Sequence, residues 1–89
     1  ALVVSNNQNN RYAATVTVLP ITSAPAKRDY PDEVSIPAGV GSLSMDSRVK
    51  ANMVRTLDQS RLINRVGSIP ERSYPAIHRA FRIHLNMLL

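Results

Sequence analysis

Short apolar stretches separated by polar or turn-forming segments make up most of the chain before its C-terminal segment. Aliphatic and β-branched residues, which favour strands, are concentrated in residues 1–5 and 13–21. Polar and apolar positions alternate in residues 33–36 and 48–54, as they do in strands with one buried face. Residues 63–69 can form one more strand. The pattern therefore predicts five strands, with 13–21 at the centre of a sheet.

The C-terminal segment, residues 73–89, carries the one good helical pattern. Its apolar residues recur at steps of three and four and form a single stripe, comprising Tyr74, Ile77, Phe81, Leu85 and Leu88. Ser73 is expected to cap this helix, and Pro75 falls in its first turn, where a missing N–H is harmless. A short helical turn is also expected over residues 58–62.

Polar and turn-forming residues connect these elements. Residues 6–11, Asn-Asn-Gln-Asn-Asn-Arg, are expected to be a loop, as are the charged residues 27–32. Residues 37–44 contain two glycines and have the composition of turns. Strands followed by a single helix predict an α+β, mainly β fold, in which a small, strongly bent antiparallel sheet carries the helix on one face.

A chain of 89 residues allows one domain, which buries only about 60–65% of its unfolded surface. It contains no cysteine, which fits a reducing compartment. The marginal core and the apolar residues 87–89 predict a two-fold homodimer with an interface above about 1,000 Å². No apolar window approaches the ~20 residues of a membrane span, and the apolar start is expected to be a strand rather than a signal peptide.

Positive charge is the strongest compositional signal. Eleven lysines and arginines oppose six acidic residues, which gives a net charge of +5 and a pI of about 10.5. Such a balance favours a polyanionic partner: RNA, DNA, an acidic protein segment or a membrane surface. The chain has three tyrosines, one phenylalanine and no tryptophan, too few rings for a stacking platform. Charge and hydrogen bonds are therefore expected to dominate any recognition of nucleic acid.

The sequence lacks the usual signatures of metal and cofactor chemistry. It has no glycine-rich phosphate loop, no cluster of histidine and cysteine, and no pair of carboxylates of the kind that two-metal nucleases use. His78 and His84 are six residues apart on the predicted helix, so they leave on different faces and are expected at the surface or in a partner contact. A nuclease built from this sequence would work without metal or cofactor, by activating the ribose 2′-OH and stabilising the phosphorane with cations and hydroxyls.

Candidate residues for that chemistry lie at strand ends and in loops. The pair Lys27-Arg28 follows Thr22-Ser23 closely, and Lys50 and Asn52 are predicted to project from the same face of one strand. A solvated loop tip explains the first pair equally well, and the polar outer face of a sheet explains the second. The residues alone therefore indicate either a basic binding protein or an RNA-cleaving one.

Motifs along the whole chain resemble those of the MazF/PemK-type toxins. The most specific covers residues 54–62, Val-Arg-Thr-Leu-Asp-Gln-Ser-Arg-Leu, which is similar to the family's IRTVDKSRL, and Arg65-Val66-Gly67 follows it like the family's ERIG. Further motifs that match in order are Leu2-Val3-Val4-Ser5-Asn6, Asn10-Arg11-Tyr12, Leu19-Pro20-Ile21-Thr22-Ser23, Pro31-x-Glu33-Val34-x-Ile36 and Met45-Asp46-Ser47. The predicted C-terminal helix also matches in spacing.

The resemblance implies a fold, an activity and partners. The fold would be an SH3-like, partly open barrel with a C-terminal helix, assembled as a symmetric homodimer. The activity would be that of a toxin–antitoxin endoribonuclease, an mRNA interferase that cuts single-stranded mRNA at short sequence motifs by 2′-OH attack, without metal, in the bacterial cytoplasm. The acidic, disordered tail of a cognate antitoxin would cover the same basic surface and block RNA.

The resemblance also assigns expected roles to individual residues. Thr22 matches the family's catalytic threonine. Lys50 and Asn52 match the arginine and aspartate that serve as acid and base in plasmid-type members, and chromosomal members often carry Glu-Gln at the positions of Asn52 and Met53. Lys50 can neutralise phosphate, but the Asn52 carboxamide is no general base. RNA contacts are expected from Asn10, Arg11, Ser23, Lys27, Arg28, Met53 and Arg55.

Two departures from the family pattern leave alternatives open. The family's catalytic arginine, opening strand and mobile loop would precede Ala1, so we expect residues 1–89 to be a single but N-terminally incomplete toxin domain. With Asn52, this leaves a catalytically impaired module or a CcdB-like gyrase poison as the alternative, although such poisons typically end in Trp-Gly-Ile and this chain ends in Asn-Met-Leu-Leu. Arg55 and Asp58 could equally form an ion pair that holds a turn.

Overall fold

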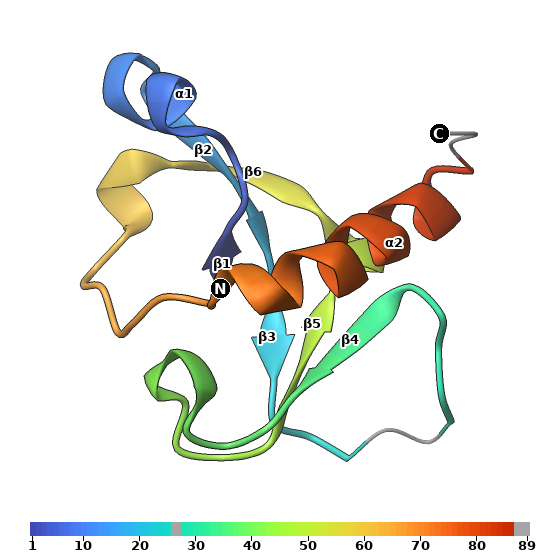
Figure 1. The fold of residues 1–89 in the computed structure, drawn as a ribbon. Coiled ribbons are helices and arrows are strands. Elements are labelled where there is room, and N and C mark those ends of the chain that lie inside the picture. The colour runs from blue at the N-terminus through green and yellow to red at the C-terminus, as the bar shows by residue number, and fades with distance from the viewer. Residues whose placement is uncertain (26–27, 87–89) are drawn as a thin grey trace.

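The computed structural model describes residues 1–25 and 28–86, and within them the chain forms six short strands and two α-helices (Figure 1). The strands are β1 (Leu2–Val3), β2 (Thr15–Leu19), β3 (Ile21–Thr22), β4 (Glu33–Ile36), β5 (Ser47–Lys50) and β6 (Arg55–Asp58). The helices are α1 (Asn7–Tyr12) and α2 (Tyr74–His84), and the 3₁₀ turns are η1 (Val40–Ser42), η2 (Ala51–Met53), η3 (Gln59–Arg61) and η4 (Glu71–Ser73).

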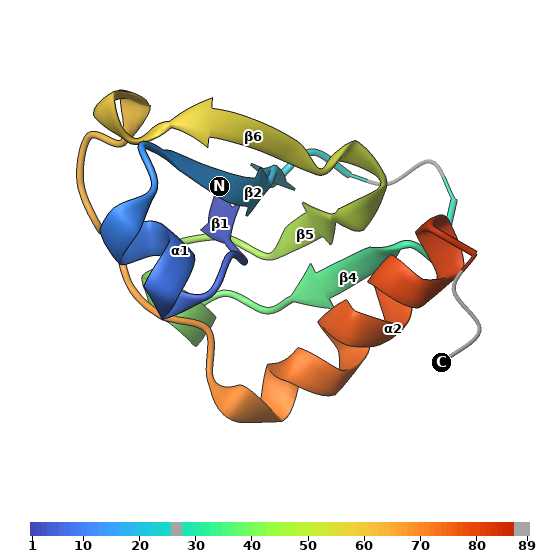
Figure 2. The same ribbon diagram turned by 90° about the horizontal axis from the view of Figure 1, so that it is seen from above.

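The strands form two three-stranded antiparallel sheets, with the orders β1-β2-β6 and β3-β5-β4. The chain passes from one sheet to the other at Pro20, which separates β2 from β3, and again at η2, which separates β5 from β6. Since proline has no N–H to donate to a ladder, it favours a break at the first of these points. The two sheets and α2 enclose a partly open barrel, as Figure 2 shows from above.

The core lies between the inner faces of the sheets and α2. Its buried residues are Leu19, Val34, Ile36, Val49, Ala51, Ile77 and Ala80. Helix α2 lies against β4 and η2 (Figure 2). At its last residue the His84 Nδ1 atom lies 3.3 Å from the Asp32 Oδ2 atom, just before β4. This α+β, mainly β arrangement with a terminal helix is the one the sequence predicts.

The predicted C-terminal helix is confirmed over Tyr74–His84, with Pro75 in its first turn. The predicted cap is wrong, because the Ser73 side chain makes no capping hydrogen bond; η4 leads directly into the helix instead. The apolar stripe is buried at Ile77 and partly at Phe81, whereas the Tyr74 and Leu85 side chains are exposed. The stripe residue Leu88 lies outside the described residues.

The expected loop at residues 6–11 is wrong, because Asn7–Tyr12 is the short helix α1. The Asn6 side chain accepts a hydrogen bond from the Asn9 backbone N–H at 2.8 Å, and asparagine is among the best residues for this capping position. The Gln59 Nε2 atom then donates to the backbone oxygens of Asn10 and Ala13, at 2.7 and 2.8 Å. These bonds tie α1 to the end of β6.

The expected strand at residues 63–69 is also wrong, and the missing strand is β6. Residues 62–70 carry no regular structure, and the Ile63 side chain is 98% exposed. A close approach of two backbones, at Gly67 and Gly41, holds the segment instead.

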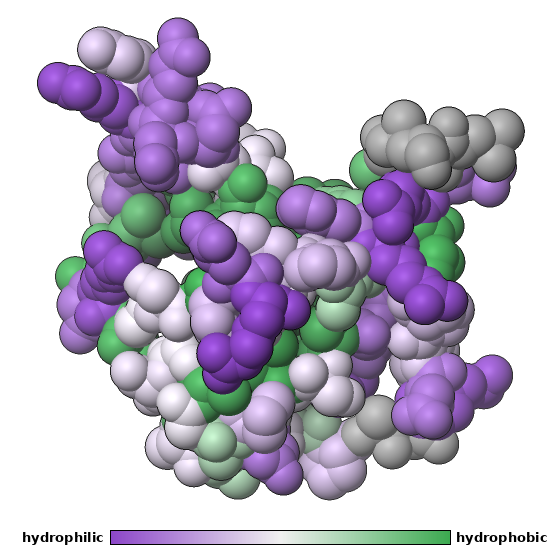
Figure 3. Space-filling model, viewed as in Figure 1, coloured by the Kyte–Doolittle hydropathy of each residue, from purple (hydrophilic) through white to green (hydrophobic). Residues whose placement is uncertain are grey.

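A groove of about 1,070 Å³ opens between β1, the segment 62–70 and the start of α2. Figure 3 shows apolar residues around this hollow and hydrophilic side chains on α1 and along α2. Ile21 and Ser47, which face the inner side of their sheet, help to line it. Among the described residues, no helix has the length and apolar character needed to cross a membrane.

Candidate functional site

Polar side chains gather on the outer face of the β3-β5-β4 sheet. Thr22 on β3 lies directly opposite Arg48 on β5, and Lys50, two residues further along β5, lies opposite Glu33 on β4. Directly opposite residues share a face of a sheet, and residues two apart on one strand do so as well. The register therefore places a hydroxyl, two cations and a carboxylate together, while Val49, between the two cations, is fully buried on the inner face.

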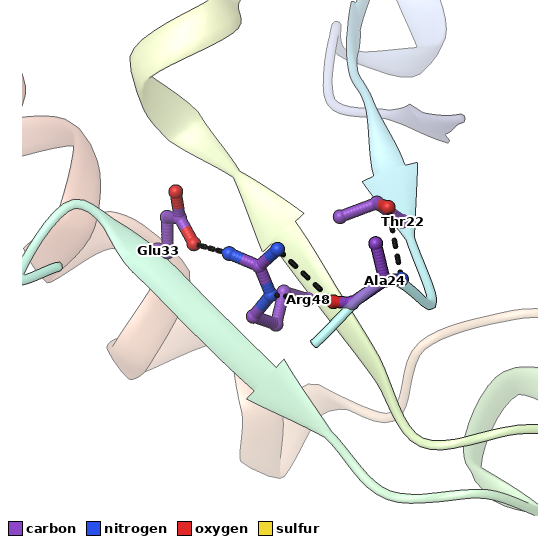
Figure 4. A network of polar contacts seen from close by, with 4 residues as sticks. All are labelled: Thr22, Ala24, Glu33 and Arg48. Atoms are coloured by element: carbon purple, nitrogen blue, oxygen red, sulfur yellow. Dashed lines mark hydrogen bonds and ion pairs between the residues drawn. The ribbon is translucent and has the colours of Figure 1, made fainter. Parts of the chain in front are cut away.

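Arg48 connects three of the elements around this face (Figure 4). Its Nη1 atom donates to the Glu33 carboxylate, and its Nε and Nη2 atoms donate to the Ala24 carbonyl oxygen at 3.3 and 3.1 Å. The Ala24 backbone N–H in turn donates to the Thr22 Oγ1 atom at 3.1 Å. The Arg48 and Glu33 side chains are 18% and 7% exposed. A continuous polar network thus runs from β4 through β5 to the hydroxyl on β3.

Thr22 occupies the position expected of it, at the end of the β3 strand and half-buried. Its Oγ1 atom accepts from the Ala24 N–H, which is the hydrogen bond of a threonine-stabilised turn. Within the described part of the chain, the Thr22 hydroxyl proton has no acceptor. This proton is therefore available to a bound ligand.

The prediction that Lys50 and Asn52 share one face of a strand is wrong. Strand β5 ends at Lys50, whose N–H donates to the Pro20 oxygen at 2.9 Å, and Asn52 lies in η2, where the chain turns toward β6. The alternation of the strand therefore does not reach Asn52. Its Oδ1 atom is buried and has no hydrogen-bond partner among residues 1–25 and 28–86.

Three other predicted RNA-contacting residues lie around η2 and the end of β3. Met53 in η2 and Arg55 at the start of β6 are exposed, and Ser23 follows Thr22 but helps to line the groove. The expected ion pair between Arg55 and Asp58 is wrong, because no such pair is present in the described structure. The two residues are three apart on one strand, so their side chains leave on opposite faces.

The remaining predicted residues are not brought together with Thr22. Asn10 and Arg11 lie on α1, beyond the end of β2 that is farther from β3 (Figure 1). The Asn10 side chain is bonded to Ser5, accepting from its Oγ and donating to its backbone oxygen at 2.9 Å, while Arg11 is exposed. Arg28 is exposed beside the Tyr30 ring, and Lys27 lies outside the described residues.

Sequence reasoning missed Arg48 and Glu33. The alternating pattern of residues 48–54 would have placed Arg48 on the same face as Lys50, and Glu33 opens a strand whose bounds were predicted correctly. They are joined to Thr22 through the backbone of Ala24, and a backbone contact of this kind cannot be predicted from side-chain patterns in a sequence. No group of three or more histidine, aspartate or glutamate side chains that could hold a metal ion occurs among the described residues.

Comparisons with known proteins agree on one family. Residues 1–85 match the family model described as the PemK-like, MazF-like toxin of type II toxin–antitoxin systems. The chain is 30% identical over 92 residues to an endoribonuclease of Mycobacterium tuberculosis named MazF9, covering 98% of the chain and 77% of that protein.

Solved structures give the same result. An endoribonuclease in complex with its cognate antitoxin, from a Mycobacterial species, superposes with a TM-score of 0.84 at 25% identity, covering 99% of the chain and 81% of the other. A MazE–MazF structure from Deinococcus radiodurans gives a TM-score of 0.80 at 28% identity, covering 98% and 81%. These matches confirm the predicted fold and the resemblance on which it rests.

Proposed function

The chain belongs to the PemK-like, MazF-like family of toxins from type II toxin–antitoxin systems, and from this membership we propose that it is a metal-independent endoribonuclease that cuts single-stranded mRNA at specific sequences. The observation that supports this activity best is the outer face of the β3-β5-β4 sheet. There the Thr22 hydroxyl lies on the same face as the cations Arg48 and Lys50.

Such a face suits cleavage by the neighbouring 2′-OH of the RNA. The 2′-hydroxyl loses its proton to water as its oxygen attacks phosphorus, the bond from phosphorus to the 5′-oxygen breaks, and that oxygen takes up a proton from water. The products are a 2′,3′-cyclic phosphate and a 5′-OH. Negative charge builds up on the non-bridging oxygens of the phosphorane, where donors and cations placed in advance are most effective. We assign the Thr22 hydroxyl as a donor to one of these oxygens and the Lys50 ammonium as the neutralising charge.

Other residues receive supporting roles in this proposal. The Asn52 carboxamide can hydrogen-bond RNA but cannot take a proton from the 2′-OH. Met53 and Arg55, exposed next to Asn52, are assigned to contacts with the nucleotides that flank the cut. Arg28 is assigned to the same path on the β3 side, together with Lys27, its neighbour in sequence, whereas Ser23 helps to line the groove and is not assigned to this path.

The partners follow from the same charge. A net charge of +5 attracts both RNA and the acidic tail of a cognate antitoxin, so we propose that the two compete for one surface. We also propose that the toxin acts as a homodimer in the bacterial cytoplasm, where mRNA is available. Light scattering at tens of micromolar protein should give twice the chain mass, and a monomer there would contradict the dimer.

The test is cleavage of a long single-stranded RNA in the presence of EDTA by the full-length protein. Discrete cuts with 2′,3′-cyclic phosphate or 3′-phosphate ends are expected, and Thr22→Ala should weaken them at least about ten-fold. Thr15→Ala is the matched control, because Thr15 is an exposed threonine on β2 in the other sheet. Uncut RNA with the unmodified protein would refute the nuclease.

Asn52 favours a second candidate function, a catalytically impaired or CcdB-like toxin that acts as a binding module. The resemblance in sequence matches this carboxamide to the general base of plasmid-type members, and its Oδ1 atom is not engaged by any described residue. The same experiment separates the two functions. Intact RNA together with tight binding of RNA or of an acidic peptide would favour the binding module.

A further inference from the structure

We propose that Arg48 is a positioning residue of the cleavage site, which fixes the orientation of the Thr22 hydroxyl through the Ala24 backbone while Glu33 holds Arg48 in place. The inference rests on the proposed nuclease function and adds to it a residue that does not itself touch RNA. It is carried by the network that joins Glu33, Arg48, Ala24 and Thr22 (Figure 4).

The first step concerns the guanidinium of Arg48. It donates from Nη1 to the Glu33 carboxylate on one side, and from Nε and Nη2 to the Ala24 oxygen on the other. A planar guanidinium can bridge two acceptors in a fixed geometry, which the single ammonium of lysine cannot do. The turn that follows β3 is therefore attached to β5 at a defined distance, although Ala24 and Arg48 are 24 residues apart in the sequence.

The second step leads from Ala24 to Thr22. Both backbone polar groups of Ala24 are engaged, the oxygen by Arg48 and the N–H by the Thr22 Oγ1 atom. A threonine side chain has few accessible χ1 rotamers, and a hydrogen bond to Oγ1 selects among them. The bond uses one lone pair of Oγ1 and leaves the hydroxyl proton free to meet a phosphate oxygen. Moving the Ala24 peptide would therefore redirect that proton.

The third step explains why Arg48 positions rather than binds substrate. Its charge is already matched by Glu33, whose side chain is only 7% exposed, and its Nε and Nη2 atoms each donate to the Ala24 oxygen. A largely buried ion pair of this kind contributes little net stability, but the planar guanidinium restricts the geometry of its partners. Lys50, directly opposite Glu33, is left without a carboxylate within ion-pair distance among residues 1–25 and 28–86. Arg48 is therefore assigned to positioning Thr22, and Lys50 to binding the phosphate.

The experiment combines Arg48→Lys with Thr22→Ala in single-turnover cleavage of RNA by the full-length protein. Because the lysine keeps the charge but loses the bridge, we expect cleavage about ten-fold slower with an RNA Kd unchanged within about two-fold. In the Thr22→Ala background the same change should have little further effect, since Arg48 acts through Thr22. Arg72→Lys, at an exposed arginine of η4, is the matched control and should change nothing.

A second measurement keeps the inference testable without catalysis. Three-bond NMR couplings to the Thr22 methyl report its χ1 rotamer, and hydrogen exchange reports the protection of the Ala24 amide. Arg48→Lys should mix Thr22 rotamers and speed Ala24 exchange, whereas Arg72→Lys should do neither. Glu33→Gln, which keeps the shape and an acceptor but removes the charge, should produce a weaker form of both effects and serves as the gentler variant.

The outcomes separate the inference from the function. If the unmodified protein leaves RNA uncut, the nuclease proposal fails, and the NMR measurements alone decide whether Arg48 orients Thr22. If Arg48→Lys slows cleavage equally in the unmodified protein and in the Thr22→Ala background, the inference is overturned, while the proposed nuclease function stands. An unchanged Thr22 rotamer and Ala24 exchange in both Arg48→Lys and Glu33→Gln would overturn it as well.

Discussion

Glu33 lies directly opposite Lys50 in the register of β4 and β5, yet its carboxylate forms an ion pair with Arg48, two residues away along β5 on the same face. The two cations of β5, Arg48 and Lys50, therefore differ in the protein groups that they contact. Arg48 is fixed on both sides, whereas Lys50 has no counter-ion among the residues that the structure describes. Because a phosphate that binds Lys50 need not displace a protein carboxylate, Lys50 is the better anchor for RNA.

Replacing Lys50 by glutamine should therefore weaken RNA binding through charge alone. On a single strand each phosphate contact releases about 0.7 of a counterion, so the slope of log affinity against log salt should become shallower by about 0.7. Anisotropy titrations of a labelled RNA at several salt concentrations measure this slope. Arg72→Gln is the control with the same loss of charge, and a slope identical to that of the unmodified protein would contradict the assignment of Lys50.

Asn52→Asp should increase cleavage, because a carboxylate can accept the 2′-OH proton and a carboxamide cannot. General base catalysis adds at least about 10²-fold when it is well placed, and we expect a gain of about ten-fold or more for an unoptimised position. The gain should be full at neutral pH, fall to half at the ordinary pKa of an aspartate, about 3.9, and disappear below it, because the protonated acid is no base. Single-turnover rates across pH measure this.

The control for that experiment is Asn64→Asp, which makes the same chemical change at an exposed asparagine in the segment 62–70. It should leave the rate and its pH dependence unchanged. A folded Asn52→Asp protein with no gain at any pH would show that Asn52 does not stand where the 2′-OH is activated.

The sequence predicts the fold well for segments whose own residue pattern determines both their secondary structure and the face that they bury. Strand β4 has its predicted bounds, and α2 has its predicted start region and its first-turn proline. Prediction failed where a single residue outweighed composition: Pro20 divides a run rich in strand-forming residues, and Asn6 caps a helix in a run with the composition of a loop. The strand predicted at 63–69 failed for another reason: the segment pairs with neither sheet, and its own residue pattern does not reveal this.

The candidate site was predictable only in part. The catalytic role of Thr22 was predicted from a resemblance in sequence, and the face shared by Arg48 and Lys50 follows from simple alternation along β5. The position of Asn52 did not follow, because the chain leaves the strand at Lys50 and turns through η2. The link from Arg48 to Thr22 passes through the backbone of Ala24, a residue whose side chain takes no part, so no pattern of side chains could have revealed it.

Gln59→Ala should destabilise the fold through α1. The Gln59 amide donates to two backbone oxygens, those of Asn10 and Ala13, and no other side chain of the described structure bonds to these two oxygens. Loss of both bonds should lower the free energy of unfolding by about 1–3 kcal/mol, since each net hydrogen bond contributes about 0.5–1.5 kcal/mol. Urea unfolding measures this, with Gln8→Ala, an exposed glutamine of α1, as the control. Equal stabilities for the two variants would contradict the role of Gln59.

Gly67→Ala tests the close backbone approach that holds the segment 62–70. A Cβ atom at Gly67 would lie 2.4 Å from the Gly41 backbone oxygen, which is far inside van der Waals contact. The oxygen belongs to backbone and cannot move aside like the end of a side chain, so the segment has to shift as a whole. We expect a loss of about 1–3 kcal/mol in the free energy of unfolding, as for other overpacked sites.

The matched control for this change is Ser68→Ala, one residue further along the same segment. Its side chain is exposed and accepts only from Arg65, an exposed residue of the same segment, so the substitution should be nearly neutral. Because the Thr22 face lies on the opposite side of its sheet from the groove that this segment lines, Gly67→Ala should leave cleavage at low temperature unchanged. Thermal unfolding together with cleavage assays measures both effects, and a stable protein with altered cleavage would show that segment 62–70 belongs to the site.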